Sequence, residues 1–163
     1  MVMIGRPRLK TSIPRPLCRN SMAKPKKTVY ISGTWDLFHV GHLRILDRAR
    51  ALGDTLIVGV NSDEYVKVLD KKTVFNFRQR SEIVAMIKGV SWVVPHKSAD
   101  DFSAFETWNI KIRVVGQDWG EVGGQDKAKK LMRKGGIKLV RLKRTKGIST
   151  SAIKRAIKNE SFC

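Results

Sequence analysis

Two histidines separated by a valine and a glycine, His39 and His42, have the spacing in this chain that points most directly to chemistry. They follow an apolar run over residues 28–32 that is typical of a β-strand, and they precede a periodic helix predicted over residues 43–52. The first N–H groups of a helix have no partner within the helix and carry partial positive charge. Such a strand-to-helix junction favours a phosphate ligand, with both imidazoles on one side of the first turn.

A second candidate anion site lies near the carboxyl end of the chain, from Arg144 to Ser151. This segment combines a guanidinium, a glycine bend at Gly147, several hydroxyl side chains and the start of a helix predicted over residues 151–158. Each of these groups can donate hydrogen bonds to phosphate oxygens. An ordinary capped helix after a glycine turn has the same pattern, but two such segments in one small domain favour a shared phosphate ligand.

The elements that must position these residues alternate along the chain. Apolar runs predict strands over residues 28–32, 55–60, 92–94, 112–115 and 137–142, and periodic segments predict helices over 43–52, 80–88, 100–108, 127–134 and 151–158. This alternation predicts an α/β fold, a single Rossmann-like, doubly wound, parallel five-stranded sheet with helices on both faces. Ligands of such sheets bind beyond the carboxyl ends of the strands. Residues 33–42, 116–119 and 144–151 all follow predicted strands.

Length and composition restrict the class of protein. The 163 residues suit one α/β domain, and no apolar run approaches the roughly 18 residues of a membrane span. The two cysteines, Cys18 and Cys163, lie at opposite ends of the chain, which argues against a disulfide framework and favours a reducing, cytoplasmic location. Zinc is a weak interpretation of the two motif histidines, because His96 is the only other histidine, so no side chain is assigned to a metal.

The formal net charge of +19 is concentrated in two segments. Residues 1–27 hold eight lysines or arginines and no acidic residue, and we expect them to form a disordered basic arm before a domain over residues 28–160. Residues 127–158 hold thirteen basic residues and no acidic one. This stretch is typical of a solvated face, of a nucleic-acid-binding surface or of a site that attracts a nucleoside triphosphate. It contains no aromatic residue on which a base could stack.

The segments GTWDLFHVGH (33–42) and RTKGISTS (144–151) resemble the two signature motifs of the cytidylyltransferase family of HxGH nucleotidyltransferases, in particular of its members that act on glycerol 3-phosphate. The segment GQDW (116–119) is similar to the GDDW of that family, and the resemblance covers residues 28–158. It implies that CMP is transferred from CTP to a phosphorylated alcohol with release of pyrophosphate. It also implies Mg²⁺ bound with the triphosphate, direct in-line attack without a covalent enzyme intermediate, and a homodimer.

The resemblance also implies roles for individual residues. His39, His42 and Arg144 would be catalytic, holding the triphosphate and stabilising the transition state. The nucleotide site would comprise Gly33, Thr34, Trp35, His39, Gly41, His42, Lys71, Asp118, Trp119, Arg144, Thr145, Gly147, Ile148, Ser149, Thr150 and Ser151. The acceptor would lie near Asp36, Arg80 and Lys97, with Asp36 orienting its own loop.

Three departures from the family pattern leave the acceptor open. Leu69 stands where the glycerol-phosphate enzymes carry a lysine, a second lysine beyond Pro95 has no clear counterpart, and Gln117 replaces an aspartate. Residues 58–63 also resemble the heptose-phosphate adenylyltransferases, so ATP and a sugar phosphate form an alternative pair of substrates. An alternative of another class is a non-catalytic nucleic-acid-binding module that uses the basic face of residues 127–158.

Overall fold

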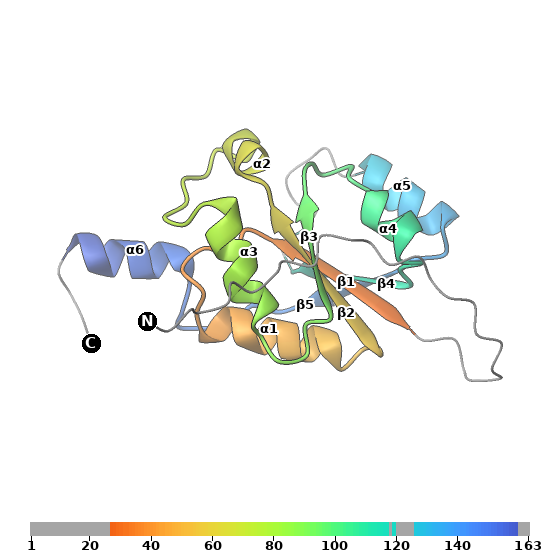
Figure 1. Cartoon of the computed structure of the whole chain (residues 1–163), viewed down its shortest axis with the longest axis horizontal. Coiled ribbons are helices and arrows are strands. Elements are labelled where there is room, and N and C mark those ends of the chain that lie inside the picture. The colour runs from red at the N-terminus through yellow and green to blue at the C-terminus, as the bar shows by residue number, and fades with distance from the viewer. Residues whose placement is uncertain (1–26, 118, 120–125, 160–163) are drawn as a thin grey trace, which may run out of the picture.

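The computed structural model describes residues 27–117, 119 and 126–159, so all but the last residue of the predicted basic arm, together with Asp118, lies outside the described residues (Figure 1). The elements follow in the order β1 (Thr28–Gly33), α1 (Val40–Arg50), β2 (Thr55–Asn61), α2 (Asp63–Val68), α3 (Phe77–Ala85), β3 (Trp92–His96), α4 (Ser103–Thr107), β4 (Ile112–Gly116), α5 (Asp126–Lys134), β5 (Lys138–Leu142) and α6 (Thr150–Lys158). In this described part, no helix is both long and apolar enough to cross a membrane.

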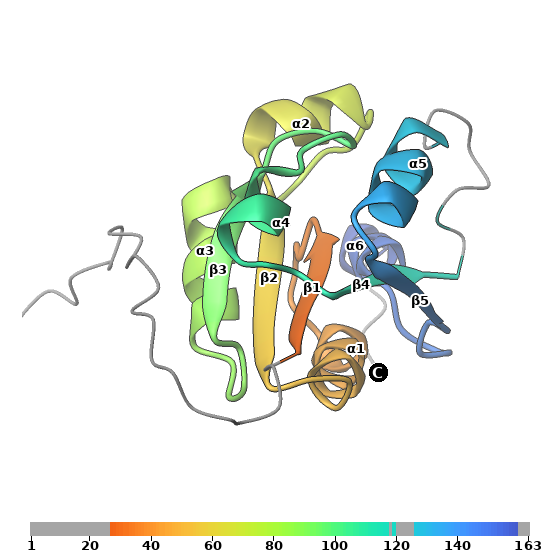
Figure 2. The same ribbon diagram turned by 90° about the vertical axis from the view of Figure 1, so that its right-hand side faces the viewer.

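The five strands form one parallel sheet in the order β3-β2-β1-β4-β5. The chain proceeds from β1 through β2 to β3, and then crosses back to β4 and β5. Strands β1 and β4 therefore flank the point where the strand order reverses. Helices α1 and α3 pack on one face of the sheet and α4 packs on the other (Figures 1 and 2). The predicted doubly wound α/β fold is confirmed.

The core consists of two apolar layers, one on each face of the sheet. Val29 and Ile31 of β1 point into the layer under α1 and α3, whereas Tyr30 points into the layer under α4. This alternation is the ordinary two-residue period of a strand. Strand β2 is buried from Leu56 to Asn61, as expected for a parallel strand covered on both faces.

The boundaries of three helices differ from the predicted ones. Helix α1 begins at Val40 because His39 is its N-cap, so the two motif histidines flank the first helical residues. Helix α3 begins at Phe77 because Asn76 and Gln79 form a capping box. Helix α4 covers only Ser103–Thr107, without a side-chain cap. The predicted helices start three residues too late for α1 and α3 and are too long for α4.

Candidate functional site

The turn between β1 and α1 is held in place by a buried tryptophan. Trp35 has a positive φ of 57°, and its indole N–H donates to the carbonyl oxygen of Gly59 at 2.9 Å. A Cβ at Gly33 would lie 3.0 Å from the Trp35 ring, so this close packing favours glycine there. The Trp35 side chain is 5% exposed and belongs to the core, so only its backbone can reach a nucleotide.

The two motif histidines stack on each other at the start of α1. Their ring centroids are 3.9 Å apart and their planes differ by 22°. Nδ1 of His39 accepts a hydrogen bond from the Gly41 N–H at 3.0 Å, so a neutral His39 ring carries its proton on Nε2. A Cβ at Gly41 would lie 2.8 Å from Cε1 of His39, which explains why glycine occupies this position.

Both rings are held in the neutral form. Burial lowers the pKa of His42 to about 4, with a further contribution from the adjacent His39, although Asp36 works in the opposite direction. Burial also lowers the pKa of His39. Nδ1 of His42 is buried and has no hydrogen-bond partner among the described residues. A buried polar atom without a partner is rare, and here it indicates a missing ligand.

The second motif packs against the first through helix α6. Ser149 caps this helix, because its Oγ accepts from the Ala152 N–H at 3.1 Å. The Thr150 hydroxyl donates to the Asp36 carbonyl oxygen at 3.0 Å. The Ile148 side chain lies 3.3 Å from where a Gly41 Cβ would be. The start of α6 and the start of α1 are thus fixed side by side, each with first-turn N–H groups suited to phosphate.

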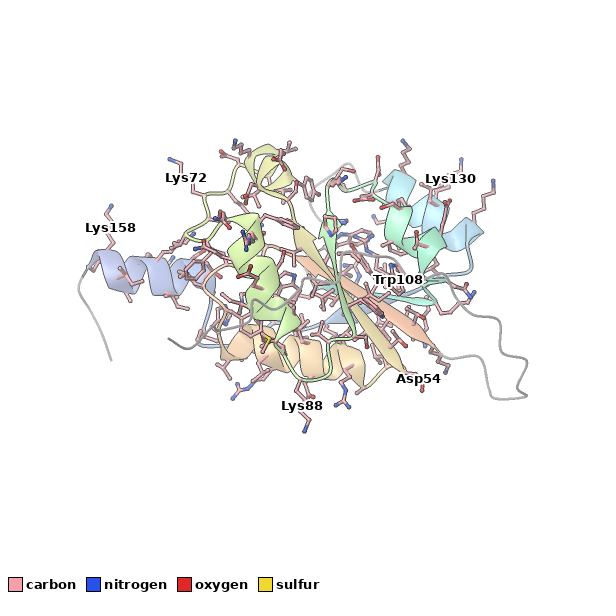
Figure 3. All side chains as sticks on the ribbon, viewed as in Figure 1. Asp54, Lys72, Lys88, Trp108, Lys130 and Lys158 are labelled. Carbon is pink, nitrogen blue, oxygen red and sulfur yellow. The ribbon has the colours of Figure 1, made fainter. Side chains whose placement is uncertain are left out.

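Two cavities are lined by other residues of the predicted site. Arg144 and Thr145 line a cavity of about 300 Å³ together with Arg44, Asp47 and Arg48 of α1. Lys71 lines a cavity of about 480 Å³, formed with Lys67, Lys72 and the backbone segment 73–76. Three guanidinium groups around the first cavity suit a polyanion. Lys130 and Lys158, by contrast, are exposed and point away from the body of the domain (Figure 3).

The side chains of Arg80 and Asp36, both predicted to lie near the acceptor, bond to other groups of the protein. Arg80 is fully buried and donates to the carbonyl oxygens of Thr34 at 2.6 Å and Asn61 at 2.8 Å. Its remaining donors reach Phe75 and Asp63. Asp36 is 2% exposed, and its carboxylate is occupied by other groups of the protein. Both side chains hold the site loops and have no open face toward a substrate.

The other predicted residues differ in how close they lie to this centre. The hydroxyl of Thr34 accepts a hydrogen bond from the Asn61 amide at 3.2 Å, at the carboxyl ends of β1 and β2. Gly147 has a positive φ of 83°, which fits the predicted bend, and Ser151 is exposed in the first turn of α6. Lys97 is exposed and directly follows β3, which is an edge strand of the sheet. Trp119 is half-buried against Arg113.

Sequence reasoning missed three residues that build the site, namely Asn61, Asp63 and Lys154. Asn61 ends β2 and bonds to Thr34, and Asp63 begins α2 and bonds to Arg80. Lys154 lies in a basic stretch and carries no distinguishing signal. Arg113, which also received no predicted role, is the single charge inside the apolar run of residues 112–115.

Comparison with known proteins agrees with this arrangement. A family model described as cytidylyltransferase-like matches residues 30–156. Glycerol-3-phosphate cytidylyltransferases of Staphylococcus aureus and Bacillus subtilis are each 36% identical to this chain over 80% of it, and over 95% and 97% of their own lengths. The bifunctional protein HldE of Aliarcobacter butzleri is 34% identical over 83% of this chain, but this covers only 28% of its own length.

A solved structure supports the fold. The lipopolysaccharide core biosynthesis protein from Thermoplasma volcanium superposes with a TM-score of 0.63 at 22% sequence identity, over 76% of this chain and 100% of that one. At this identity, the similarity extends to the fold alone.

Proposed function

The chain belongs to the cytidylyltransferase-like family of nucleotidyltransferases, and from this premise we propose that it transfers CMP from CTP to a phosphorylated alcohol of the glycerol 3-phosphate type. Relatives of that name cover 80% of this chain and nearly their own full length. The observation that carries the proposal is the pair of stacked, neutral imidazoles placed between two helix N-termini.

The reaction needs no covalent enzyme intermediate. A non-bridging oxygen of the acceptor phosphate forms a bond to the α-phosphorus of CTP. The bond between that phosphorus and the bridging oxygen to the β-phosphate breaks, and its electron pair leaves with pyrophosphate. Catalysis is then positioning together with stabilisation of the charge that develops on the phosphate oxygens.

His39, His42 and Arg144 are the residues we assign to that stabilisation. The neutral imidazoles donate hydrogen bonds to the phosphate oxygens from the start of α1, and Arg144 adds positive charge from the first cavity. The β- and γ-phosphates are assigned to the first-turn N–H groups of α6, including those of Thr150 and Ser151. Thr34, Lys71, Thr145, Gly147, Ser149 and Trp119 complete the proposed nucleotide site.

Mg²⁺ is proposed to arrive with the triphosphate. Across the described residues, no group of three or more His, Cys, Asp or Glu side chains is arranged to hold a metal ion. The carboxylate within the motif, Asp36, is already paired with Lys154. This donor set fits an ion that is coordinated by phosphates and water, which neutralises charge on the leaving pyrophosphate.

The direct test is pyrophosphate release from purified protein with CTP or ATP and a set of phosphorylated acceptors. We expect turnover with CTP and glycerol 3-phosphate, and a loss of at least about a hundredfold in His42→Ala. Lys158→Ala is the matched control, since it changes an exposed side chain at the far end of α6. Full turnover in His42→Ala would show that the motif histidines have another role.

Adenylyl transfer to a sugar phosphate is the second candidate, because bifunctional HldE proteins match more than four-fifths of this chain. The chain spans about a quarter of their length, so the match concerns one part of those proteins. Turnover with ATP and a sugar phosphate, but not with CTP, would select this candidate. The family match favours either reaction over a nucleic-acid-binding module.

The homodimer, the cytoplasmic location and the domain boundaries at residues 28 and 160 stay predictions. Light scattering coupled to size-exclusion chromatography tests the first of them.

A further inference from the structure

Arg113 is a buried charge without an acceptor. It is the second residue of β4 and is 2% exposed. Its Nε and Nη1 atoms have no hydrogen-bond partner within the part of the chain that the structure describes. Arg80 is equally buried, yet each of its three guanidinium nitrogens donates to a protein oxygen. The fold therefore supplies hydrogen-bond acceptors to Arg80 but not to Nε and Nη1 of Arg113.

Aromatic rings surround the Arg113 guanidinium. Its central carbon lies 5.8 Å from the centre of the Tyr30 ring, and 5.4 Å from each of the Phe105 and Trp119 rings. The Tyr30 hydroxyl lies 3.0 Å from Nδ1 of His96. Tyr30 and Phe105 are buried and Trp119 is half-buried, so Trp119 is the outermost of the three rings. We call these five residues the Arg113 cluster.

The cluster holds one positive charge and no negative one at neutral pH. Burial, helped by Arg113, lowers the pKa of His96 to about 4, so His96 is uncharged. Burial raises the pKa of Tyr30 despite the nearby guanidinium, so Tyr30 is uncharged as well. The carboxylate of Asp101 interacts with Arg113 electrostatically, but it accepts its hydrogen bonds from the Ser103 hydroxyl and from the Lys97 N–H. Ring faces compensate a buried cation only in part.

The position of the cluster within the sheet indicates what it serves. Arg113 of β4 is in register with Tyr30 of β1, and these two strands flank the reversal of strand order. Ligands of doubly wound sheets bind in the crevice at that point. The histidines and the start of α6 lie at the start of α1, on the α1 side of the sheet, whereas Tyr30 and Phe105 lie on the α4 side. The Arg113 cluster therefore lies across the sheet from the two motifs, and Trp119 is the residue that it shares with the proposed nucleotide site.

We propose that Arg113 binds the phosphate group of the acceptor and is a specificity-determining residue of the transfer reaction. This inference rests on the proposed function. An acceptor phosphate must approach the anionic α-phosphate of the nucleotide, and a guanidinium on its far side neutralises part of that repulsion. The oxygens of the phosphate then supply the acceptor atoms that Nε and Nη1 lack, with the half-buried Trp119 as the outermost ring beside them.

The test compares Arg113→Met with the wild type and with Lys111→Met, which removes the same charge from an exposed position just before β4. With saturating CTP, we expect the KM for glycerol 3-phosphate to rise about tenfold to a hundredfold in Arg113→Met, as for a lost hydrogen bond to a charged group. The KM for CTP should change less than about twofold in both variants. Ligand-free Arg113→Met should unfold at the wild-type temperature or above, because an unpaired buried charge is lost.

The possible outcomes separate the inference from the proposed function. An unchanged KM for the acceptor, or a parallel rise in the KM for CTP, overturns the assignment of Arg113. A fall of more than about 5 °C in the unfolding temperature of ligand-free Arg113→Met also overturns it, since the residue would then be structural. Failure of the proposed function shows separately, as a wild type that releases no pyrophosphate with any acceptor. In that case, protection by inorganic phosphate in the presence of α,β-methylene-CTP decides, and equal protection of wild type and Arg113→Met contradicts the inference.

Discussion

The ammonium group of Lys154 lies 2.9 Å from the buried Oδ2 of Asp36, joining helix α6 to the loop between β1 and α1. The same carboxylate accepts from the N–H groups of Val74 and Phe75, each at 3.1 Å. Burial opposes ionisation, but the hydrogen bonds from Lys154 and these two N–H groups hold the pKa of Asp36 below its ordinary value. One carboxylate thereby fixes the first motif, the segment after α2 and the helix of the second motif.

Lys154→Met should loosen this junction. The Asp36 side chain would keep its two backbone donors but lose its counter-charge, and the Lys154 side chain is 34% exposed, so we expect a loss of about 1–3 kcal/mol in the free energy of unfolding. The KM for CTP should rise, because one of the contacts that hold α6 against the loop between β1 and α1 is lost. Denaturant unfolding and steady-state kinetics measure the two effects. Lys158→Met, on the same helix and exposed, should change neither, and an equal effect of both substitutions would contradict the role of the pair.

Acid should destabilise the protein before its carboxylates are protonated. Burial lowers the pKa of both His42 and His96 to about 4, whereas unfolded histidine titrates near 6.5. As the pH falls from about 6.5 to 4, these histidines bind protons in the unfolded chain but stay neutral in the folded protein. Stability is thus present above the unfolded pKa and lost below it, by about 1.4 kcal/mol per pH unit for each histidine.

Guanidinium unfolding at several pH values between 7.5 and 4.5 checks this prediction. His96→Gln keeps a polar side chain near the Tyr30 hydroxyl and removes one of the three histidines whose pKa burial lowers. Its stability should fall less steeply with acidification than that of the wild type, by about 1.4 kcal/mol per pH unit. Identical slopes for the two proteins would mean that His96 titrates normally in the fold.

The sequence predicted the strands better than the helix ends, for a physical reason. The five strands are short runs that are mostly apolar and rich in Val, Ile and Leu, so their residues identify them directly. The ends of α1 and α3 depend on the caps His39 and Asn76. A histidine cap has no strong sequence preference, and its role depends on the bond from the Gly41 N–H.

The candidate site divides in the same way. His39, His42 and the start of α6 were predicted because their chemistry is local, lying within a few residues of a helix N-terminus. The role of Arg80 and the partners of Asp36 were not, because they depend on residues such as Thr34 and Lys154 that only the fold brings near. A buried structural arginine and a substrate-binding arginine look alike in a sequence, because they differ in whether the guanidinium donates to protein oxygens or to a substrate.

Gly41→Ala should impair activity more than stability. The new Cβ would lie 2.8 Å from Cε1 of His39 and 3.3 Å from the Ile148 side chain, so the His39 ring must move and its stack on His42 is lost. We expect a fall of at least about a hundredfold in kcat with CTP, because a displacement of about 1 Å costs that much. Gly135→Ala is the control, since its new Cβ meets only ordinary contacts at 3.4 Å. If both variants retained wild-type kcat, the stacked arrangement would not matter for catalysis.

Arg80→Met should destabilise the protein strongly, in contrast to Arg113→Met. It removes all donors to four protein oxygens, among them the carbonyls of Thr34 and Asn61 and the carboxylate of Asp63, and leaves them buried or half-buried without a cation. We expect a loss of about 3–5 kcal/mol in the free energy of unfolding, measured by denaturant titration. Arg78→Met is the matched control two residues away, where an exposed pair with Glu82 is worth about 0.5 kcal/mol or less. If Arg80→Met instead kept wild-type stability and raised only the KM for the acceptor, Arg80 would bind the acceptor, as the sequence predicted, and would not be a positioning residue.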